Sequence, residues 1–162
     1  MSSYHLRRIR PYAIRAARQT DLDAIVALES RCFPKGHYGR RSLAFHIDNP
    51  KSAVIVARVD GVARGFALVR FRSNSSCGRL MSLAVAPAFR GMGLGSALLA
   101  AAERACQQRG FQGLRLEARQ YRLSFYMRQG YRIFGALAAY YADGRGARQL
   151  EKLFMPATRL RA

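Results

Sequence analysis

The chain has 162 residues, of which 50% are hydrophobic and 10% aromatic, so it is long enough and apolar enough to bury a core as one domain. Its 28 basic residues outnumber nine acidic ones, giving a net charge of +19. The three cysteines lie far apart and form no Cys-x-x-Cys pair, which argues against a disulfide framework or a structural zinc site. No secretory signal and no apolar run of about 20 residues is visible, so we expect a cytoplasmic protein without a membrane span.

The first half of the chain predicts one strand, two helices and then an antiparallel run of strands. Thr20, followed by acidic residues, is typical of a helix start, and Pro34 with Gly36 marks the end of that helix. Asp60-Gly61 indicates a hairpin turn between two runs rich in β-branched residues. The expected elements are a strand at 12–17, helices at 20–33 and 40–48, strands at 53–59, 62–72 and 80–85, and a polar loop at 73–78.

The pattern changes after Pro87, where a glycine-rich turn runs into a helix rich in alanine and leucine. The order of elements mixes one β-α-β crossover with antiparallel hairpins. It predicts a mixed α/β fold, with a central, mostly antiparallel, twisted sheet of six to seven strands flanked by about four helices. We expect one domain over residues 1–162 with its core at about 11–155. The elements expected in this half are helices at 91–109 and 123–129 and strands at 113–117, 131–134 and 150–155.

The most informative stretch is the turn Arg90-Gly-Met-Gly-Leu-Gly-Ser96. Its three alternate glycines let the backbone turn sharply and approach a ligand. The first N–H groups of the following helix have no partner within the helix, and with the helix dipole they form an anion site that suits a pyrophosphate. Arg90 adds a positive charge. The stretch is not a P-loop, because no Gly-Lys-Ser/Thr follows, and three glycines are more than a simple helix start requires.

This turn and four other segments resemble the GNAT N-acetyltransferase family. Arg-x-x-Gly-x-Gly, after a strand that ends Leu83-Ala84-Val85, is similar to the family's acetyl-CoA signature. The residues at 20–23, 116–119 and 125–131 are similar to three further family motifs, and Tyr-Tyr-Ala-Asp-Gly at 140–144 resembles the ribosomal-protein alanine N-acetyltransferase branch. The resemblance covers residues 11–155. It implies the GNAT fold and transfer of an acetyl group from acetyl-CoA to an amine, without a metal.

The resemblance also implies where acetyl-CoA binds. The pantetheine arm would pair with the exposed backbone of the strand end, as an added strand, where that strand splays from the strand at 114–117. The pyrophosphate would bind the N–H groups of the glycine-rich turn. The residues expected to contact acetyl-CoA are Leu83, Ala84, Val85, Arg90, Gly91, Met92, Gly93, Leu94, Gly95 and Ser96.

Two catalytic residues are implied by position in the family motifs. Tyr126 is the candidate acid for the departing thiolate, with a packed aromatic as the alternative. Glu117 is the candidate base for the amine, with a carboxylate paired to an arginine as the alternative. The backbone N–H of Val85 or a neighbour is the implied oxyanion donor. Glu117 and Tyr126 are nine residues apart, where the family commonly has twelve, and the family asparagine between them is absent. Either Glu117 or a water is therefore the base. The strand at 80–85 also lacks the glutamate that many members use, with Ser82 in that region.

The acceptor is less constrained than the cofactor. His37, Tyr140 and Tyr141 are the candidate acceptor-binding residues, against a plain loop for His37 and hairpin packing for the tyrosines. A peptide or protein N-terminus is slightly favoured over a lysine or a small amine, and aminoacyl-tRNA is a further alternative. A different class, a non-catalytic nucleic-acid-binding protein on the same fold, is suggested by the charge. No aromatic-basic RNA motif supports it. The chain is compatible with a monomer or a homodimer.

Overall fold

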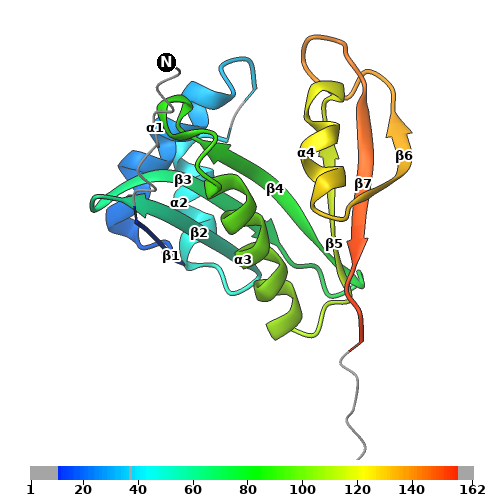
Figure 1. Ribbon diagram of the computed structural model, residues 1–162, viewed down its shortest axis with the longest axis horizontal. Coiled ribbons are helices and arrows are strands. Elements are labelled where there is room, and N and C mark those ends of the chain that lie inside the picture. The colour runs from blue at the N-terminus through cyan, green and yellow to red at the C-terminus, as the bar shows by residue number, and fades with distance from the viewer. Residues whose placement is uncertain (1–10, 37, 157–162) are drawn as a thin grey trace, which may run out of the picture.

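The computed structural model describes residues 11–36 and 38–156, which form one seven-stranded sheet with helices on both faces (Figure 1). The strand order is β1-β2-β3-β4-β5-β7-β6, and among these strands the β4–β5 pair is parallel while the other neighbours are antiparallel. This confirms the expected mixed α/β fold. The strands are β1 (Tyr12–Ala16), β2 (Ser52–Val59), β3 (Val62–Arg70), β4 (Cys77–Val85), β5 (Gly113–Ala118), β6 (Arg132–Leu137) and β7 (Ala147–Leu153). The helices are α1 (Leu22–Cys32), α2 (Arg40–Asp48), α3 (Leu94–Gln108) and α4 (Leu123–Arg128).

The helices divide the core into two layers. α3 and α4 pack on one face of the sheet, where Leu98, Leu99 and Tyr126 are buried. α1 and α2 pack on the other face, where Ile25 and Leu43 are fully buried against β2 and β3. Because both faces are covered, β2 and β3 are apolar along almost their whole length instead of alternating with polar residues.

β4 and β5 lie side by side only where they begin. Their parallel register comprises residues 77–79 of β4 and 113–115 of β5. Glycine is required where β4 and β5 are paired, because a Cβ on Gly78 would lie 2.6 Å from Cys106 Sγ. Beyond this paired stretch the two strands diverge, with β4 continuing beside β3 and β5 beside β7 (Figure 1). The sheet therefore opens toward the carboxyl ends of β4 and β5, as the family resemblance implied.

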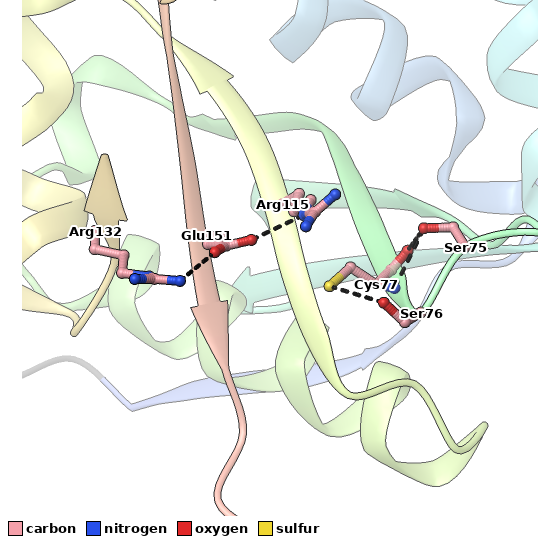
Figure 2. Close-up of polar contacts among 6 residues, drawn as sticks. All are labelled: Ser75, Ser76, Cys77, Arg115, Arg132 and Glu151. Atoms are coloured by element: carbon pink, nitrogen blue, oxygen red, sulfur yellow. Dashed lines mark hydrogen bonds and ion pairs between the residues drawn. The ribbon is translucent and has the colours of Figure 1, made fainter. Parts of the chain in front are cut away.

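Two strands begin three residues earlier than the sequence predicted. β4 begins at Cys77, where the prediction had a polar loop reaching residue 78. The Ser75 hydroxyl donates to the Cys77 carbonyl oxygen at 3.0 Å and accepts from the Cys77 N–H at 3.3 Å (Figure 2). This side chain closes the turn, so the residues after it are free to join the strand. β7 likewise begins at Ala147, not at residue 150, because the backbone of residues 147–149 pairs with β5 and β6.

The start of α1 is organised by Asp21 and not by Thr20, so the predicted cap was wrong. The Asp21 carboxylate accepts the Arg18 N–H at 2.8 Å and both terminal nitrogens of Arg15 at 2.7 and 3.0 Å. The hydrogen bond from Arg15 is the main reason that the pKa of Asp21 lies below its usual range. These hydrogen bonds tie the turn before α1 to β1, and the Asp21 side chain itself caps none of the N–H groups of α1.

A buried carboxylate ties the last three strands together. Glu151 of β7 accepts from Arg115 Nε of β5 at 2.9 Å and from Arg132 Nη2 of β6 at 2.7 Å (Figure 2). Burial alone would raise the pKa of Glu151, but the hydrogen bonds and charges of the two guanidinium groups outweigh burial and hold that pKa below its usual range. This ion triad fixes the β6–β7 hairpin against the rest of the sheet.

Replacing Glu151 with glutamine is expected to lower the free energy of unfolding by about 1.5–3 kcal/mol at pH 7, because two charge-assisted hydrogen bonds lose their charge. The native pKa is depressed, so the carboxylate stabilises the fold above its unfolded-state pKa, and this stabilisation is lost as the pH falls through the native pKa. Urea unfolding at pH 7, 5 and 3 should therefore show a shrinking difference from wild type. Asp23→Asn is the control, since Asp23 pairs with Arg40 at the surface and should change stability by less than about 0.5 kcal/mol. A difference independent of pH would contradict this account.

Candidate active site

A cavity of about 830 Å³ lies where β4 and β5 diverge. Its walls come from the end of α1 and the loop after it, from β4, from β5 and the turn that follows, from α4, and from the segment between β6 and β7. The structure thus brings the predicted catalytic and acceptor-binding tyrosines to one cavity with Glu117. The predicted residues that line it are Leu83, Glu117, Tyr126, Tyr140 and Tyr141.

The glycine-rich turn has the geometry of an anion site. Gly91 and Gly93 have φ angles of +78° and +84°, in the left-handed region that favours glycine. The backbone hydrogen-bond ladder of α3 begins with the Ala97 N–H, which donates to the Gly93 carbonyl oxygen at 3.0 Å. The N–H groups of residues 94–96 precede this ladder and point out of the helix end. A Cβ on Gly93 would meet nothing within 4 Å, so this helix end has an open face.

Other residues of the turn contact neighbouring elements. A Cβ on Gly95 would lie 3.4 Å from the Phe125 ring, at van der Waals distance, so the turn packs beside α4. The Ser96 hydroxyl accepts from Gln129 Nε2 at 3.0 Å, beyond the end of α4. Arg90 Nε donates to the Val85 carbonyl oxygen at 3.1 Å. Arg90 is therefore directed at the end of β4, and the N–H groups at the start of α3 are the donors left available to an anion.

The edge of β4 that faces the opening is available for backbone pairing. Val85 and Leu83 are paired to β3 in register, but their side toward β5 has no strand partner, since the β4–β5 pairing ends at Arg79. The Ala86 N–H donates to the Arg64 carbonyl oxygen at 2.8 Å, on the β3 side. Because successive backbone groups in a strand point to opposite sides, the N–H groups of Val85 and Leu83 point toward the opening.

Tyr126 lies at the cavity with its ring in the core. The residue is 5% exposed, and its ring makes edge-to-face contacts with Phe125 at 5.0 Å and Tyr131 at 5.8 Å between centroids. Burial raises the pKa of Tyr126 to about 12, against the opposing charge of Arg122. The phenol therefore keeps its proton at neutral pH, which a proton donor requires.

Arg79 holds Glu117 at the cavity wall. One terminal nitrogen of Arg79, Nη2, lies 3.1 Å from Glu117 Oε2 and donates to the Tyr140 hydroxyl at 3.2 Å. The Glu117 side chain is 16% exposed, so its carboxylate is partly desolvated while it lines the cavity. The ion pair that the sequence left as an alternative is present, and it positions the carboxylate at the cavity.

A second carboxylate, which the sequence analysis missed, lines the same cavity. Glu29 of α1 is 2% exposed, and it accepts from the Ser82 hydroxyl at 2.7 Å and the Tyr38 N–H at 3.2 Å. The sequence offers one sign that Glu29 is buried: it lies four residues after Ile25, on the side of α1 that faces the core. Ser82, where the family often has a glutamate, thus contacts a carboxylate that comes from α1.

Tyr38, also missed, lies among these charged groups. Burial raises the pKa of the Tyr38 phenol; Tyr140, Glu29 and Glu117 add to the rise, and Arg79 opposes it. All of these groups therefore act on one hydroxyl at the cavity wall. A sequence gives no sign of this grouping, because Tyr38 follows α1 and the others come from α1, β4, β5 and the segment after β6.

The segment between β6 and β7 forms the far wall. The Tyr141 ring lies 5.0 Å from that of Tyr140, edge to face, and 3.8 Å from the Arg119 guanidinium carbon. Arg119 donates to Asp143 at 2.8 Å, and the Asp143 carboxylate also accepts the Arg145 N–H at 3.0 Å. These contacts place both tyrosines at the cavity, where they were expected as acceptor-binding residues.

His37, the remaining candidate for acceptor binding, lies outside the described residues. Across residues 11–36 and 38–156 no three or more His, Cys, Asp or Glu side chains are grouped so that they could hold a metal ion. No helix in the same ranges is long and apolar enough to cross a membrane.

Comparison with known proteins gives the family. The family model described as "Acetyltransferase (GNAT) family" matches residues 22–131. An N-alpha-acetyltransferase from Sulfurisphaera tokodaii is 30% identical over 152 residues, covering 85% of this chain and 90% of that protein. The chain belongs to the GNAT family of acetyltransferases. It is an acetyl-CoA-dependent enzyme that transfers an acetyl group to an amine, which confirms the expected enzyme class over the non-catalytic alternative.

Solved structures confirm the fold. The ribosomal-protein-S18-alanine N-acetyltransferase from Escherichia coli matches with a TM-score of 0.79 at 24% identity, covering 93% of this chain and 99% of that one. Ard1 from Thermoplasma volcanium matches with a TM-score of 0.78 at 27% identity, covering 90% and 99%. The GNAT fold that the motifs implied is therefore present along almost the whole chain.

Proposed function

We propose that the enzyme acetylates the N-terminal α-amine of a peptide or protein. The observation that carries this proposal is the placement of two carboxylates, Glu29 and Glu117, in the cavity that also holds Tyr126. Carboxylates compensate the cost of bringing an ammonium group out of water. The wall at Tyr140, 43% exposed, borders solvent, so a chain can extend outward from the cavity. Similarity to an N-alpha-acetyltransferase over 90% of its length supports the same acceptor class.

In this proposal the open helix end and the edge of β4 bind acetyl-CoA. The N–H groups of residues 94–96 receive the pyrophosphate, with Gly91 and Gly93 supplying the backbone shape. The free edge at Leu83 and Val85 pairs with the pantetheine amides as an added strand would. The thioester then lies between β4 and β5, where the Tyr126 phenol lines the cavity.

The reaction needs three groups, and we assign one group of this chain to each role. The ammonium loses its proton to Glu117 or to a water that Glu117 holds, which frees the lone pair that attacks the thioester carbonyl. The N–H of Val85 donates to the oxyanion that forms with the new C–N bond. As the C–S bond breaks, the Tyr126 hydroxyl donates its hydrogen bond, and finally its proton, to the departing thiolate.

Glu117→Gln tests the base. We expect kcat/KM for a peptide acceptor to fall about 100-fold at pH 7, within the usual range for a lost general base. The loss should shrink toward pH 9, because a free α-amine has a pKa of about 8 and is then mostly unprotonated. Initial rates from pH 6.5 to 9.5 measure this.

Glu103→Gln is the matched control for the base. Glu103 also bonds a cation and a hydroxyl, Lys152 at 2.8 Å and Tyr131 at 3.0 Å, but it does not line the cavity. Its replacement should leave kcat/KM within about twofold of wild type. If the loss in Glu117→Gln were the same at every pH, Glu117 would only shape the site. A pH-dependent loss in Glu29→Gln alone would move the base role to Glu29.

The acceptor class is tested with one peptide that carries both a free N-terminus and an internal lysine. We expect fragmentation mass spectrometry to place the acetyl group on the α-nitrogen alone. The same peptide with a formylated N-terminus should give no product. Small amines and aminoacyl-tRNA are offered in parallel. Acetylation of either of these, with an unmodified peptide, would overturn the proposal in favour of that acceptor.

We also propose that residues 1–162 act as one acetyltransferase domain with a core at about 11–155, in the cytoplasm. A single sheet that runs from Tyr12 to Leu153 supports the first part. Three free thiols, Cys32, Cys77 and Cys106, support the second, since thiols persist in a reducing compartment.

A further inference from the structure

We propose that the acceptor cavity selects chains whose residues directly after the N-terminal one are acidic. This inference rests on the proposed α-amine acceptor. It concerns the charge of the acceptor residues that follow the one bearing the amine. It comes from how positive and negative side chains are distributed between the interior of the cavity and its rim.

The interior of the cavity is negative. Glu29 is 2% exposed and the Glu117 side chain is 16% exposed, and both line the cavity. These carboxylates favour the positive charge of an incoming ammonium.

The rim of the cavity is positive. Five basic residues line the cavity against three acidic ones. Two of the five are engaged with acidic partners, Arg79 with Glu117 and Arg119 with Asp143. The other three, which we call the free rim cations, make no ion pair with a carboxylate within the part of the chain that the structure describes. They are Lys35, Arg122 and Arg145.

The free rim cations lie on separate walls of the cavity. Lys35 follows α1 and Arg145 precedes β7, and both are exposed. Arg122, before α4, has its guanidinium carbon 5.5 Å from the centre of the Phe33 ring and 5.6 Å from that of the Tyr121 ring. These aromatic rings attract the cation but do not neutralise its charge. A peptide that extends from the cavity toward solvent would therefore lie near these cations.

Arg79 lies between the interior and the rim of the cavity, and its buried Nε has no partner among the described residues. Its Nη2 contacts both Glu117 and the Tyr140 hydroxyl. A peptide carboxylate near the rim would reduce the electrostatic repulsion among the cations that line the cavity. A lysine or arginine there would raise it. The cavity is thus complementary to an amine followed by carboxylates.

The test uses three peptides with the same first residue and the same tail: Ala-Glu-Glu-, Ala-Gly-Gly- and Ala-Lys-Lys-. At 50 mM salt we expect kcat/KM for the acidic peptide to exceed that of the neutral one by about 5- to 20-fold, mainly through KM, as two or three exposed charge pairs allow. The basic peptide should be the poorest. The ratio should fall to about twofold at 0.5 M salt, because exposed charges are screened.

The double variant Lys35→Glu/Arg145→Glu should abolish or reverse the preference. Its charge-matched control is Arg72→Glu/Arg104→Glu, which removes two exposed arginines that do not line this cavity; Arg104 borders a second cavity of about 610 Å³ near α3 and β1. The control should keep the preference for the acidic peptide. If it loses the preference too, the overall charge acts and the rim assignment is wrong.

The outcomes separate this inference from the proposed function. Equal rates for the three peptides, or a faster basic peptide, with the acetyl group on the α-nitrogen, would overturn the inference and leave the proposed function intact. An acidic preference that persists in Lys35→Glu/Arg145→Glu would overturn the rim assignment. No α-nitrogen product from any peptide would overturn both.

Discussion

Glutamate in place of Gly93 is expected to weaken acetyl-CoA binding at least 100-fold in a calorimetric titration. Gly93 has φ +84° and an open face at the helix end where the N–H groups of residues 94–96 point. A glutamate there puts a side chain and a negative charge where the pyrophosphate is proposed to bind, which reverses the electrostatics of the helix terminus.

The control for Gly93→Glu is Gly110→Glu, at the other end of α3. Gly110 has φ +79°, and a Cβ there also meets nothing within 4 Å. Both variants pay the same left-handed strain of about 1–2 kcal/mol and gain the same charge. Both should therefore lose similar stability in thermal unfolding, but only Gly93→Glu should lose acetyl-CoA. Equal affinities in the two variants would contradict a cofactor site at this helix end.

Tyr126→Phe is expected to lower kcat by about 100- to 1,000-fold, the range for loss of a general acid. The acetyl-CoA dissociation constant should stay within about threefold, because the hydroxyl acts on the departing thiolate and not on the bound cofactor. Since the pKa of Tyr126 is about 12, the wild-type enzyme should show no loss of activity from this group below about pH 11. Stopped-flow or steady-state rates with a peptide acceptor measure both effects.

Tyr131→Phe is the matched control for Tyr126→Phe. The two rings are in contact, but the Tyr131 hydroxyl donates to Glu103 at 3.0 Å and does not line the cavity. Its loss should lower the free energy of unfolding by about 1–3 kcal/mol and leave kcat within about twofold. If Tyr126→Phe keeps more than a third of wild-type kcat, Tyr126 is only a packed aromatic, the alternative that its sequence context allowed.

Local patterns predicted much of this molecule. The β-branched run at 53–59, the Asp60-Gly61 turn and the alanine-rich helix after the glycines correspond to β2, the β2–β3 hairpin and α3. These elements were predictable because periodicity and turn chemistry act over neighbouring residues. The first residues of β4 and of α1 were not predictable. Each start is fixed by hydrogen bonds of one side chain, Ser75 for β4 and Asp21 for α1, and that side chain could have bonded elsewhere.

Those parts of the candidate site that depend on backbone shape or on a family motif were predictable. The glycines of the turn and the positions of Glu117 and Tyr126 were found in this way. Glu29 and Arg79 were not, because their importance arises only when α1, β4 and β5 converge. The orientation of Arg90 toward Val85 likewise depends on how the turn meets the strand end, which the order of residues does not specify.

The most direct test of the account uses one conjugate, an Ala-Glu-Glu- peptide whose α-nitrogen is joined through an acetyl bridge to the sulfur of coenzyme A. If one cavity brings the thioester to an α-amine, calorimetry should show the conjugate binding at least about 100-fold more tightly than coenzyme A alone, because both halves bind as one molecule. Gly93→Glu should remove most of that affinity. A conjugate that binds no more tightly than coenzyme A alone would contradict an α-amine site between β4 and β5.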